Sequence, residues 1–255
     1  MMTQAQAHIR VRDLTLRYGE KLIQQNLNFD VNNNDIFIIM GGSGCGKSTL
    51  LKHMIGLYQP AEGQIWVNND SLWQVSESKR QRMMQHFGVS YQAGALVSSL
   101  TLAENVGMPL ELYTKLSPKE VAELASLKLS MVGLAGFEAY YPAEISGGML
   151  KRAALARAIA LDPEILFFDE PSAGLDPLSA RLLDDLILEL SDSMKSTIVM
   201  VTHELASIFS IGNNSVFLDT ETQTMLATGN PNLLLTDCEN PKVQQFLRRG
   251  EVMNA

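Results

Sequence analysis

IFIIMGGSGCGKS, residues 36 to 48, contains two patterns from which the fold of this 255-residue chain follows. Its first five residues, Ile36 to Met40, form a continuous apolar run that ends at a glycine-rich turn. Such a run is typical of a strand that is buried on both faces. The remaining residues, Gly41 to Ser48, fit the spacing G-x-x-x-x-G-K-S/T of a phosphate-binding P-loop, and we expect a helix from Lys47 to about Leu57. A buried strand, a glycine-rich loop and a helix in this order predict an α/β protein.

The P-loop is the first candidate site. Its backbone N–H groups can surround phosphate oxygens, and the start of the following helix adds positive potential. Lys47 is expected to reach the β- and γ-phosphates of a nucleotide, and Ser48 to bind Mg²⁺. The expected nucleotide-binding residues of this loop are Gly41, Gly42, Ser43, Gly44, Cys45, Gly46, Lys47, Ser48 and Thr49. Because Cys45 is near a helix N-terminus and Lys47, we expect its thiol to have a lowered pKa and to be reactive.

Strands and helices alternate in the second half of the chain. ILFFD (165–169) and STIVMVT (196–202) have the pattern of buried strands, and residues 177–194 have that of a helix. Buried strands that alternate with helices predict a mostly parallel sheet covered on both faces. The alternating patterns of residues 9–19 and 27–31 predict an antiparallel sheet beside it, and a helical pattern runs from Ala93 to about Leu161. No linker separates these parts, so we expect one compact unit.

Composition excludes several classes of function. The formal net charge is −8, which argues against nucleic acid as the main partner, because phosphate contacts need clustered Lys and Arg. Two cysteines, Cys45 and Cys238, make no disulfide framework, and a reducing compartment is expected. The N-terminus has no apolar run that would serve as a secretion signal, and the longest apolar stretches are too short to span a bilayer. We therefore expect a soluble chain that reaches a membrane only through another chain.

Five further residues are candidates for chemistry on nucleotide phosphates. Asp169 ends a buried strand, where a carboxylate can hold the metal, and Glu170 can act as general base on the attacking water. His203 follows another buried strand, at the strand end where open α/β sheets keep their ligands. Gln92 follows the pattern GVSY, and Tyr18 could stack on a base. Each of the last three also has an ordinary explanation in surface or core packing.

ISGGMLKR, residues 145 to 152, suggests a second anion site. Ser146, Gly147 and Gly148 precede a helix that we expect from Met149 to Leu161. Paired glycines lower helix stability, so some function should require them. Serine and glycine amides at the start of a helix can bind an anion.

The order of these motifs resembles one family. The P-loop, Gln92, SGG, FFDE, GLD and His203 follow one another as in the ATP-binding cassette (ABC) ATPases, over residues 11 to 226. The resemblance implies the ABC ATPase fold, in which a RecA-like, mostly parallel sheet core carries an antiparallel β subdomain and a helical subdomain. It also implies a single ABC ATP-binding domain over residues 1–255, with the helical subdomain at about 93–161 and a short helical C-terminal tail at about 230–255.

The same resemblance implies roles for the candidate residues. ATP would lie between two chains of a head-to-tail homodimer, where Ser146, Gly147 and Gly148 contact the γ-phosphate held by the partner's P-loop. Tyr18 would stack on adenine, Asp176 would lie at the dimer contact, and Gln92 would line the Mg²⁺ and sense a membrane partner. The implied catalytic residues are Glu170, His203 and Lys47, and the implied Mg²⁺ ligands are Ser48, Gln92 and Asp169. The sequence departs from most such ATPases at Met149, where they carry Gln.

Three longer stretches narrow the resemblance. Residues 91–111, residues 146–177 and NPKVQQFL (240–247) look like the ATPase of Mce-type lipid transporters, which include the maintenance-of-lipid-asymmetry (Mla) systems. That family implies phospholipid or other lipid transport through a separate membrane permease and a periplasmic Mce-domain protein, with the ATPase peripheral on the cytoplasmic face of the inner membrane. A small regulatory subunit is a further candidate partner. We expect the apolar stretch from Leu96 to Leu112 to form the groove for the permease.

Three alternatives remain open. The chain could be the ATPase of an ABC importer for a small solute. It could be an ABC protein that acts on ribosomes or DNA, although those usually carry two cassettes or large inserts and this chain is acidic. It could also be an ATP-dependent clamp that does not hydrolyse ATP, although the presence of Glu170 and His203 argues against this.

Overall fold

The computed structural model describes residues 7–92 and 94–249. The chain divides into two compact units, not the one that the lack of a linker predicted. The first comprises residues 1–84 and 197–255, and the second residues 85–196. Within the described ranges, none of the helices combines the length and the apolar character that crossing a membrane requires.

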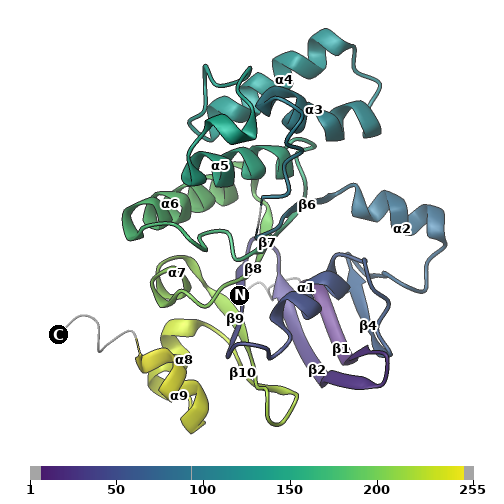
Figure 1. Ribbon diagram of the computed structural model, residues 1–255. Coiled ribbons are helices and arrows are strands. Elements are labelled where there is room, and N and C mark those ends of the chain that lie inside the picture. The colour runs from purple at the N-terminus through teal and green to yellow at the C-terminus, as the bar shows by residue number, and fades with distance from the viewer. Residues whose placement is uncertain (1–6, 93, 250–255) are drawn as a thin grey trace, which may run out of the picture. The chain divides into compact units, whose positions relative to one another are not determined.

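An antiparallel sheet forms one part of the first unit (Figure 1). Its strands are β1 (Ala7–Tyr18), β2 (Lys21–Asn32), β4 (Glu62–Val67) and β5 (Asp70–Ser71), in the order β2-β1-β4-β5. Gly63 at the start of β4 has φ +80°, and a Cβ atom there would lie 2.3 Å from the carbonyl oxygen of Asp13. Only glycine permits this approach of two backbones.

Parallel strands form the other part of the first unit. β3 (Ile36–Gly41) pairs in parallel with β8 (Thr197–Val201) on one side and with β9 (Asn214–Leu218) on the other. Every residue of β3 and β8 is buried, as the continuous apolar runs predicted. β10 (Met225–Thr228) pairs with β9 antiparallel.

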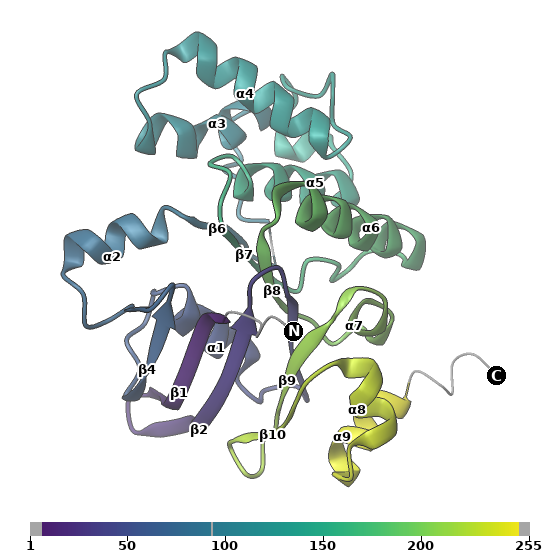
Figure 2. The ribbon, with the colours of Figure 1, turned by 180° about the vertical axis from the view of Figure 1, so that it is seen from behind.

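Five helices belong to the first unit. They are α1 (Lys47–Met54), α2 (Glu77–Met84), α7 (Leu205–Ile211), α8 (Pro231–Asp237) and α9 (Pro241–Arg248) among the described residues. α8 and α9 begin alike, with an asparagine N-cap followed by proline. They lie side by side (Figure 2) within the segment from about 230 to 255 where a short helical tail was expected, and residues 250–255 are outside the described residues.

The second unit combines two parallel strands with helices. β6 (Phe87–Ser90) pairs with β7 (Ile165–Asp169). Its helices are α3 (Leu102–Tyr113), α4 (Pro118–Met131), the 3₁₀ turn η1 (Pro142–Glu144), α5 (Gly147–Ala158) and α6 (Pro177–Met194). α5 packs closely on β6, because a Cβ atom at Gly88 would lie 2.2 Å from the carbonyl oxygen of Ala158. α3, α4 and α5 lie within the region from Ala93 to about Leu161 that has a helical pattern, and Ala93 lies outside the described residues.

Several boundaries differ from the sequence-based expectation. α5 begins at Gly147, not at Met149, because the Ser146 side chain accepts a hydrogen bond from the Met149 N–H and caps the helix there. It ends at Ala158, before the expected Leu161. α1 ends at Met54, before Leu57, since Gly56 at φ +79° breaks the helical backbone. The helix α2 was not predicted, because it buries none of its residues and so has no apolar stripe.

Stability of the second unit should depend on one buried cation. Lys128 of α4 is 4% exposed, and its Nζ lies 2.5 Å from Oδ1 of Asp162. We predict that Asp162→Asn lowers the free energy of unfolding by about 1–3 kcal/mol, because a buried ammonium loses its counter-charge. Asparagine keeps the left-handed backbone of this position, where φ is +49°.

Urea unfolding of the full chain measures this effect. Glu123→Gln is the matched control, because its pair with Lys119 (3.8 Å) joins two exposed side chains. We expect the control to lower the free energy of unfolding by about 0.5 kcal/mol or less. Equal effects of the two substitutions would contradict the assigned role of burial.

Candidate functional site

The P-loop joins β3 to α1 in the first unit. Gly46 is the N-cap of α1 and has φ +98°, and a Cβ atom there would lie 2.6 Å from Cγ2 of Ile23. Unlike α3, α4, α5, α6, α8 and α9, α1 has no N-cap side chain that accepts a hydrogen bond from its first turn, because its N-cap is Gly46. The positive end of the helix dipole at this start fits an anion such as phosphate.

Lys47 lies along the inside of this loop. Its Nζ donates to the carbonyl oxygens of Gly41 (3.0 Å) and Gly42 (2.9 Å), and the residue is 9% exposed. Gly42, Ser43 and Gly44 are exposed, whereas Ser48 and Thr49 are half-buried. The loop therefore places a cation next to exposed backbone, as a phosphate site needs.

The expectation for Cys45 was wrong. Cys45 is 1% exposed, and burial raises the pKa of its thiol, although the charge and the backbone N–H of Lys47 act in the opposite direction. A buried thiol cannot form the thiolate that reagents attack. The position in the sequence suggested a reactive group, but the side chain points into the protein.

Strand register places His203 at the same edge as the P-loop. Ile39 of β3 pairs with Val201 of β8, and Gly41 and His203 each follow two residues later. The exposed His203 ring lies 3.6 Å from the carboxylate of Glu204. Tyr18, at the end of β1, is 49% exposed and makes an edge-on contact with Tyr58, with ring centroids 6.0 Å apart. Tyr18 thus has a packing partner and also an exposed ring available for stacking.

The second unit brings three other candidates to one edge. Ser90 of β6 pairs with Phe168 of β7, so that Gln92 and Glu170 each follow the paired residues by two. Asp169 is buried (8% exposed), and Glu170 is half-buried with φ +53°. Such a backbone is unfavourable for a non-glycine residue, and residues of this kind concentrate at functional sites.

Ser146, Gly147, Gly148 and Asp176 line a separate groove of about 700 Å³ in the second unit. The end of α4 and one face of α6 complete its walls, with Val132, Leu182 and Glu189 among the lining residues. Asp176 is the N-cap of α6 and accepts hydrogen bonds from the N–H groups of Leu178 (3.1 Å) and Ser179 (3.0 Å). Hydrogen bonds from Ser179 lower the pKa of Asp176, so the carboxylate stays charged.

Two cations on α5 were missed by the sequence analysis. Lys151 Nζ donates to the carbonyl oxygen of Gln92, and Arg157 donates to those of Ala95 (2.6 Å) and Gly94 (3.0 Å). Burial lowers the pKa of Lys151, an effect that the nearby charge of Glu170 opposes. The helix that begins with SGG therefore also holds the loop after Gln92.

The loop after Gln92 contains left-handed backbone and is also held by a residue of α3. Gly94 and Ala95 both have left-handed backbones, with φ of +73° and +51°. Asn105 of α3 is fully buried, and its amide donates to the carbonyl oxygens of Val97, Leu100 and Thr101. Strained backbone persists only where surrounding contacts determine it. No sequence pattern marked these contacts, because they are made to main-chain carbonyls.

Comparisons with known proteins agree with this geometry. The family model of the ABC transporter domain matches residues 24–173. The chain is 36% identical to the intermembrane phospholipid transport system ATP-binding protein MlaF of Haemophilus influenzae, over 94% of this chain and 90% of that protein. It is also 36% identical to the probable ribonucleotide transport ATP-binding protein mkl of Mycobacterium leprae, over 94% of this chain and 68% of that protein.

Solved structures give the same result. A dimeric post-hydrolysis state of the ATP-binding cassette MJ0796, bound to ADP and Pi, matches with a TM-score of 0.78 at 27% identity, over 87% of this chain and 98% of that one. cbiO1 from Clostridium perfringens matches in fold with a TM-score of 0.83 at 24% identity, over 98% of this chain and all of that one.

A P-loop at the end of a buried parallel strand and a capped SGG helix define a nucleotide-binding ATPase. The chain belongs to the ABC transporter family. It is an ATP-binding and ATP-hydrolysing subunit with the ABC ATPase fold, which confirms the prediction from the motifs.

The burial of Cys45 leads to a test. We predict that a thiol reagent modifies native Cys238, which is half-buried, well before Cys45, which should react only on unfolding. Labelling followed by peptide mass spectrometry measures both sites, and Cys238→Ser isolates the signal of Cys45. Fast labelling of Cys45 that MgATP suppresses would contradict this prediction.

The hydrogen bonds of Arg157 to the carbonyl oxygens of Gly94 and Ala95 lead to a second test. Arg157→Lys keeps the charge but cannot reach two carbonyls with one planar fork. We predict that amide hydrogen exchange between residues 94 and 101 accelerates by about tenfold while the rest of the second unit is unchanged. Arg152→Lys is the matched control, because Arg152 lies on the same helix and donates to Val132 and Gly133 (both 3.3 Å). Equal exchange rates of residues 94 to 101 in the two variants would argue against this role of Arg157.

Proposed function

We propose that this chain is the ATPase subunit of a cell-envelope lipid transporter, acting on phospholipid through a separate membrane permease. The observation that carries this proposal is its similarity to MlaF proteins over 94% of this chain and 88–90% of theirs. The runner-up, an ABC importer of a small solute, is favoured by equal identity to a probable ribonucleotide transport protein, of which the chain covers only 68%.

The P-loop, Tyr18 and His203 of the first unit bind the nucleotide. Backbone amides from Gly41 to Thr49 bind the phosphates, and Tyr18 stacks its exposed ring on adenine. Lys47 exchanges its two neutral carbonyl partners for phosphate oxygens, because hydrogen bonds between ions are stronger. His203, at the same edge as the loop, contacts the γ-phosphate and the attacking water.

The metal and the general base complete the chemistry. Hydroxyl, amide and carboxylate oxygens suit Mg²⁺, and the proposed ligands are Ser48, Gln92 and Asp169. When bound, Mg²⁺ supplies charge neutralisation at the phosphates. Glu170 takes the proton of the attacking water.

A second copy of the chain completes the site. We propose a head-to-tail homodimer in which Ser146, Gly147 and Gly148 contact the partner's γ-phosphate, with Asp176 at the dimer contact. The exposed Ser146 and Gly147, the groove beside them and the dimeric solved relative support this arrangement. In this proposal both compact units belong to a single ATP-binding domain, over residues 1–255, with its helical subdomain at about 93–161.

Membrane partners follow from the same similarity. The proposed partners are an integral-membrane permease, a periplasmic Mce-domain protein and a small regulatory subunit, with the chain peripheral on the cytoplasmic face of the inner membrane. The permease groove is proposed between residues 96 and 112, where Val97 and Leu112 are 38% and 67% exposed.

The general base gives a direct test of the chemistry. Glu170→Gln keeps size and hydrogen bonding but cannot accept a proton, so we predict a fall in ATP turnover of about 10²–10⁴-fold. ATP binding should persist, because the P-loop is intact. Glu123→Gln, which changes an exposed carboxylate on α4 outside the proposed site, is the matched control. Near-normal turnover of Glu170→Gln in the assembled complex would refute the assignment.

The transport function is tested in the assembled complex. We predict that a tagged chain, purified from detergent-solubilised membranes of its native host, brings a multispan permease and an Mce-domain protein with it. In proteoliposomes this complex should move fluorescent phospholipid only with hydrolysable ATP. Co-purification of a permease with a soluble solute-binding protein and no lipid movement would favour the small-solute importer.

A further inference from the structure

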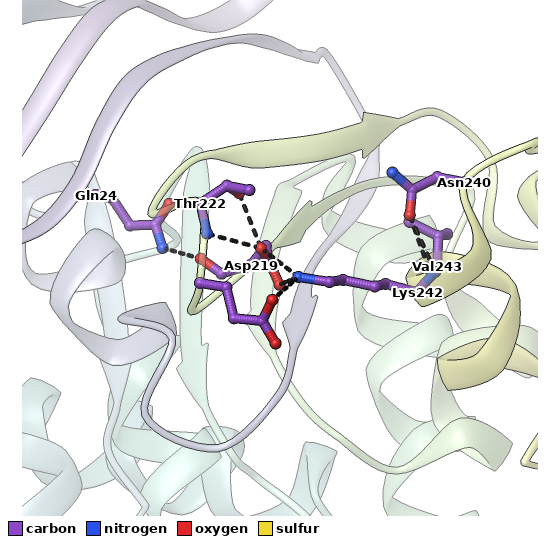
Figure 3. A network of polar contacts seen from close by, with 7 residues as sticks. Gln24, Asp219, Thr222, Asn240, Lys242 and Val243 are labelled. Atoms are coloured by element: carbon purple, nitrogen blue, oxygen red, sulfur yellow. Dashed lines mark hydrogen bonds and ion pairs between the residues drawn. The ribbon is translucent and has the colours of Figure 1, made fainter.

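A buried side chain outside the motif supports the P-loop. Gln24 in β2 is fully buried, and its Nε2 donates to the carbonyl oxygens of Cys45 (2.7 Å) and Asp219 (2.9 Å). Figure 3 shows the bond to Asp219. One amide group therefore joins the middle of the P-loop to the residue that follows β9. Moving the Cys45 carbonyl would leave a buried hydrogen bond unmade, which is costly.

The residues after β9 also pack directly against the start of the loop. Gly41 has φ +146°, and a Cβ atom there would lie 2.3 Å from the carbonyl oxygen of Leu218. A Cβ atom at Gly42 would lie 3.9 Å from Oγ1 of Thr220. Residues 218–220 thus form a wall against which the P-loop begins, and a shift of this wall would shift the loop.

Lys242 holds this wall from the C-terminal helix. Its Nζ lies 2.9 Å from Oδ2 of Asp219 and 2.8 Å from Oε2 of Glu221. The Asp219 carboxylate also accepts hydrogen bonds from the N–H and the hydroxyl of Thr222, both at 2.9 Å, as Figure 3 shows. Burial would raise the pKa of Asp219, but the bonds from Thr222 and Lys242 outweigh this effect and lower it to about 2. Asp219 is therefore ionised at neutral pH.

The helix that carries Lys242 is itself anchored. Val243 and Leu247 of α9 are fully buried, and Phe246 makes an edge-on contact with Phe217 of β9, with ring centroids 5.3 Å apart. Asn240 caps the helix by accepting from the Lys242 N–H at 3.0 Å. Lys242 thus reaches Asp219 from an anchored helix. Through this ion pair, a movement of α9 would move Asp219.

We propose that Lys242 is a positioning residue for nucleotide binding, which acts through Asp219 and Gln24 on the P-loop. The chain of contacts is continuous: α9 holds Asp219, Asp219 and Cys45 share the Gln24 amide, and Leu218 touches Gly41. A partner that displaces α9 would therefore change the affinity for ATP without touching the nucleotide. This inference rests on the proposed role of the P-loop as the ATP site.

The experiment compares Lys242→Met with Lys79→Met in the full-length chain. Lys79 forms an ion pair with Asp70 (2.6 Å) in the same unit, and both residues lie outside the P-loop and the segment after β9. Titration with the magnesium complex of a fluorescent (mant) ATP gives the Kd. We expect Lys242→Met to weaken binding by about two- to tenfold, the equivalent of one net hydrogen bond. Lys79→Met should bind as the unmodified chain does.

Two further variants separate positioning from folding. Lys242→Arg should restore binding, because a guanidinium can pair with both carboxylates. Asp219→Asn, compared with Asp70→Asn, removes the same charge pair from the other side and should weaken binding in the same direction. Equal affinities of the Lys242 and Lys79 variants, or a loss of thermal stability in Lys242→Met with an unchanged Kd, would overturn the proposal. Lys47→Ala tests the P-loop as the ATP site separately from the role of Lys242. If this variant binds ATP as the unmodified chain does, the assignment of the P-loop fails.

Discussion

β3 is buried along its whole length, and both of its neighbours run parallel to it. A strand in this position can present only its carboxyl end to a ligand, because its faces and edges are occupied. The P-loop therefore has to begin where β3 ends, and the close approach of the Leu218 carbonyl leaves no room there for any side chain. Glycine at position 41 is thus a packing requirement as well as part of a phosphate-binding motif. The positions of His203 and of the segment after β9 follow from the same parallel register.

Cations that bind main-chain carbonyls recur in both units. Lys47 holds Gly41 and Gly42, Lys151 holds Gln92, Arg157 holds Gly94 and Ala95, and Gln24 plays the same part with a neutral amide. A carbonyl is present whatever the side chain, so such contacts fix a loop without dictating its sequence. They suit loops whose backbone must be placed accurately while the side chains serve a ligand or a partner.

This also explains what the sequence could and could not predict. The P-loop, the SGG helix and the buried strands were predictable, because each depends on local residue types at fixed spacing. The cap of α4 by Ser117, with Glu120 in reciprocal contact, was predictable for the same reason. Gln24, Arg157 and Lys242 were not, since their partners lie 21, 62 and 23 residues away and are carbonyls or one acid among many. Cys45 was misjudged because sequence proximity to Lys47 says nothing about the direction of a side chain, and burial outweighs the nearby charge.

The ammonium of Lys47 donates to the carbonyls of Gly41 and Gly42 and so contributes to the shape of the P-loop. In the proposed binding of ATP, it exchanges these carbonyls for phosphate oxygens. When a phosphate draws the ammonium away, these carbonyls lose a charged donor, and the loop would be free to relax unless other contacts keep its shape. Gln24 and the wall after β9 are such contacts, because neither involves Lys47 and both act on the side of the loop that faces the protein. A loop held from behind can exchange the partner of its lysine without losing the arrangement of its amides, and this preorganisation lowers the entropy lost on binding.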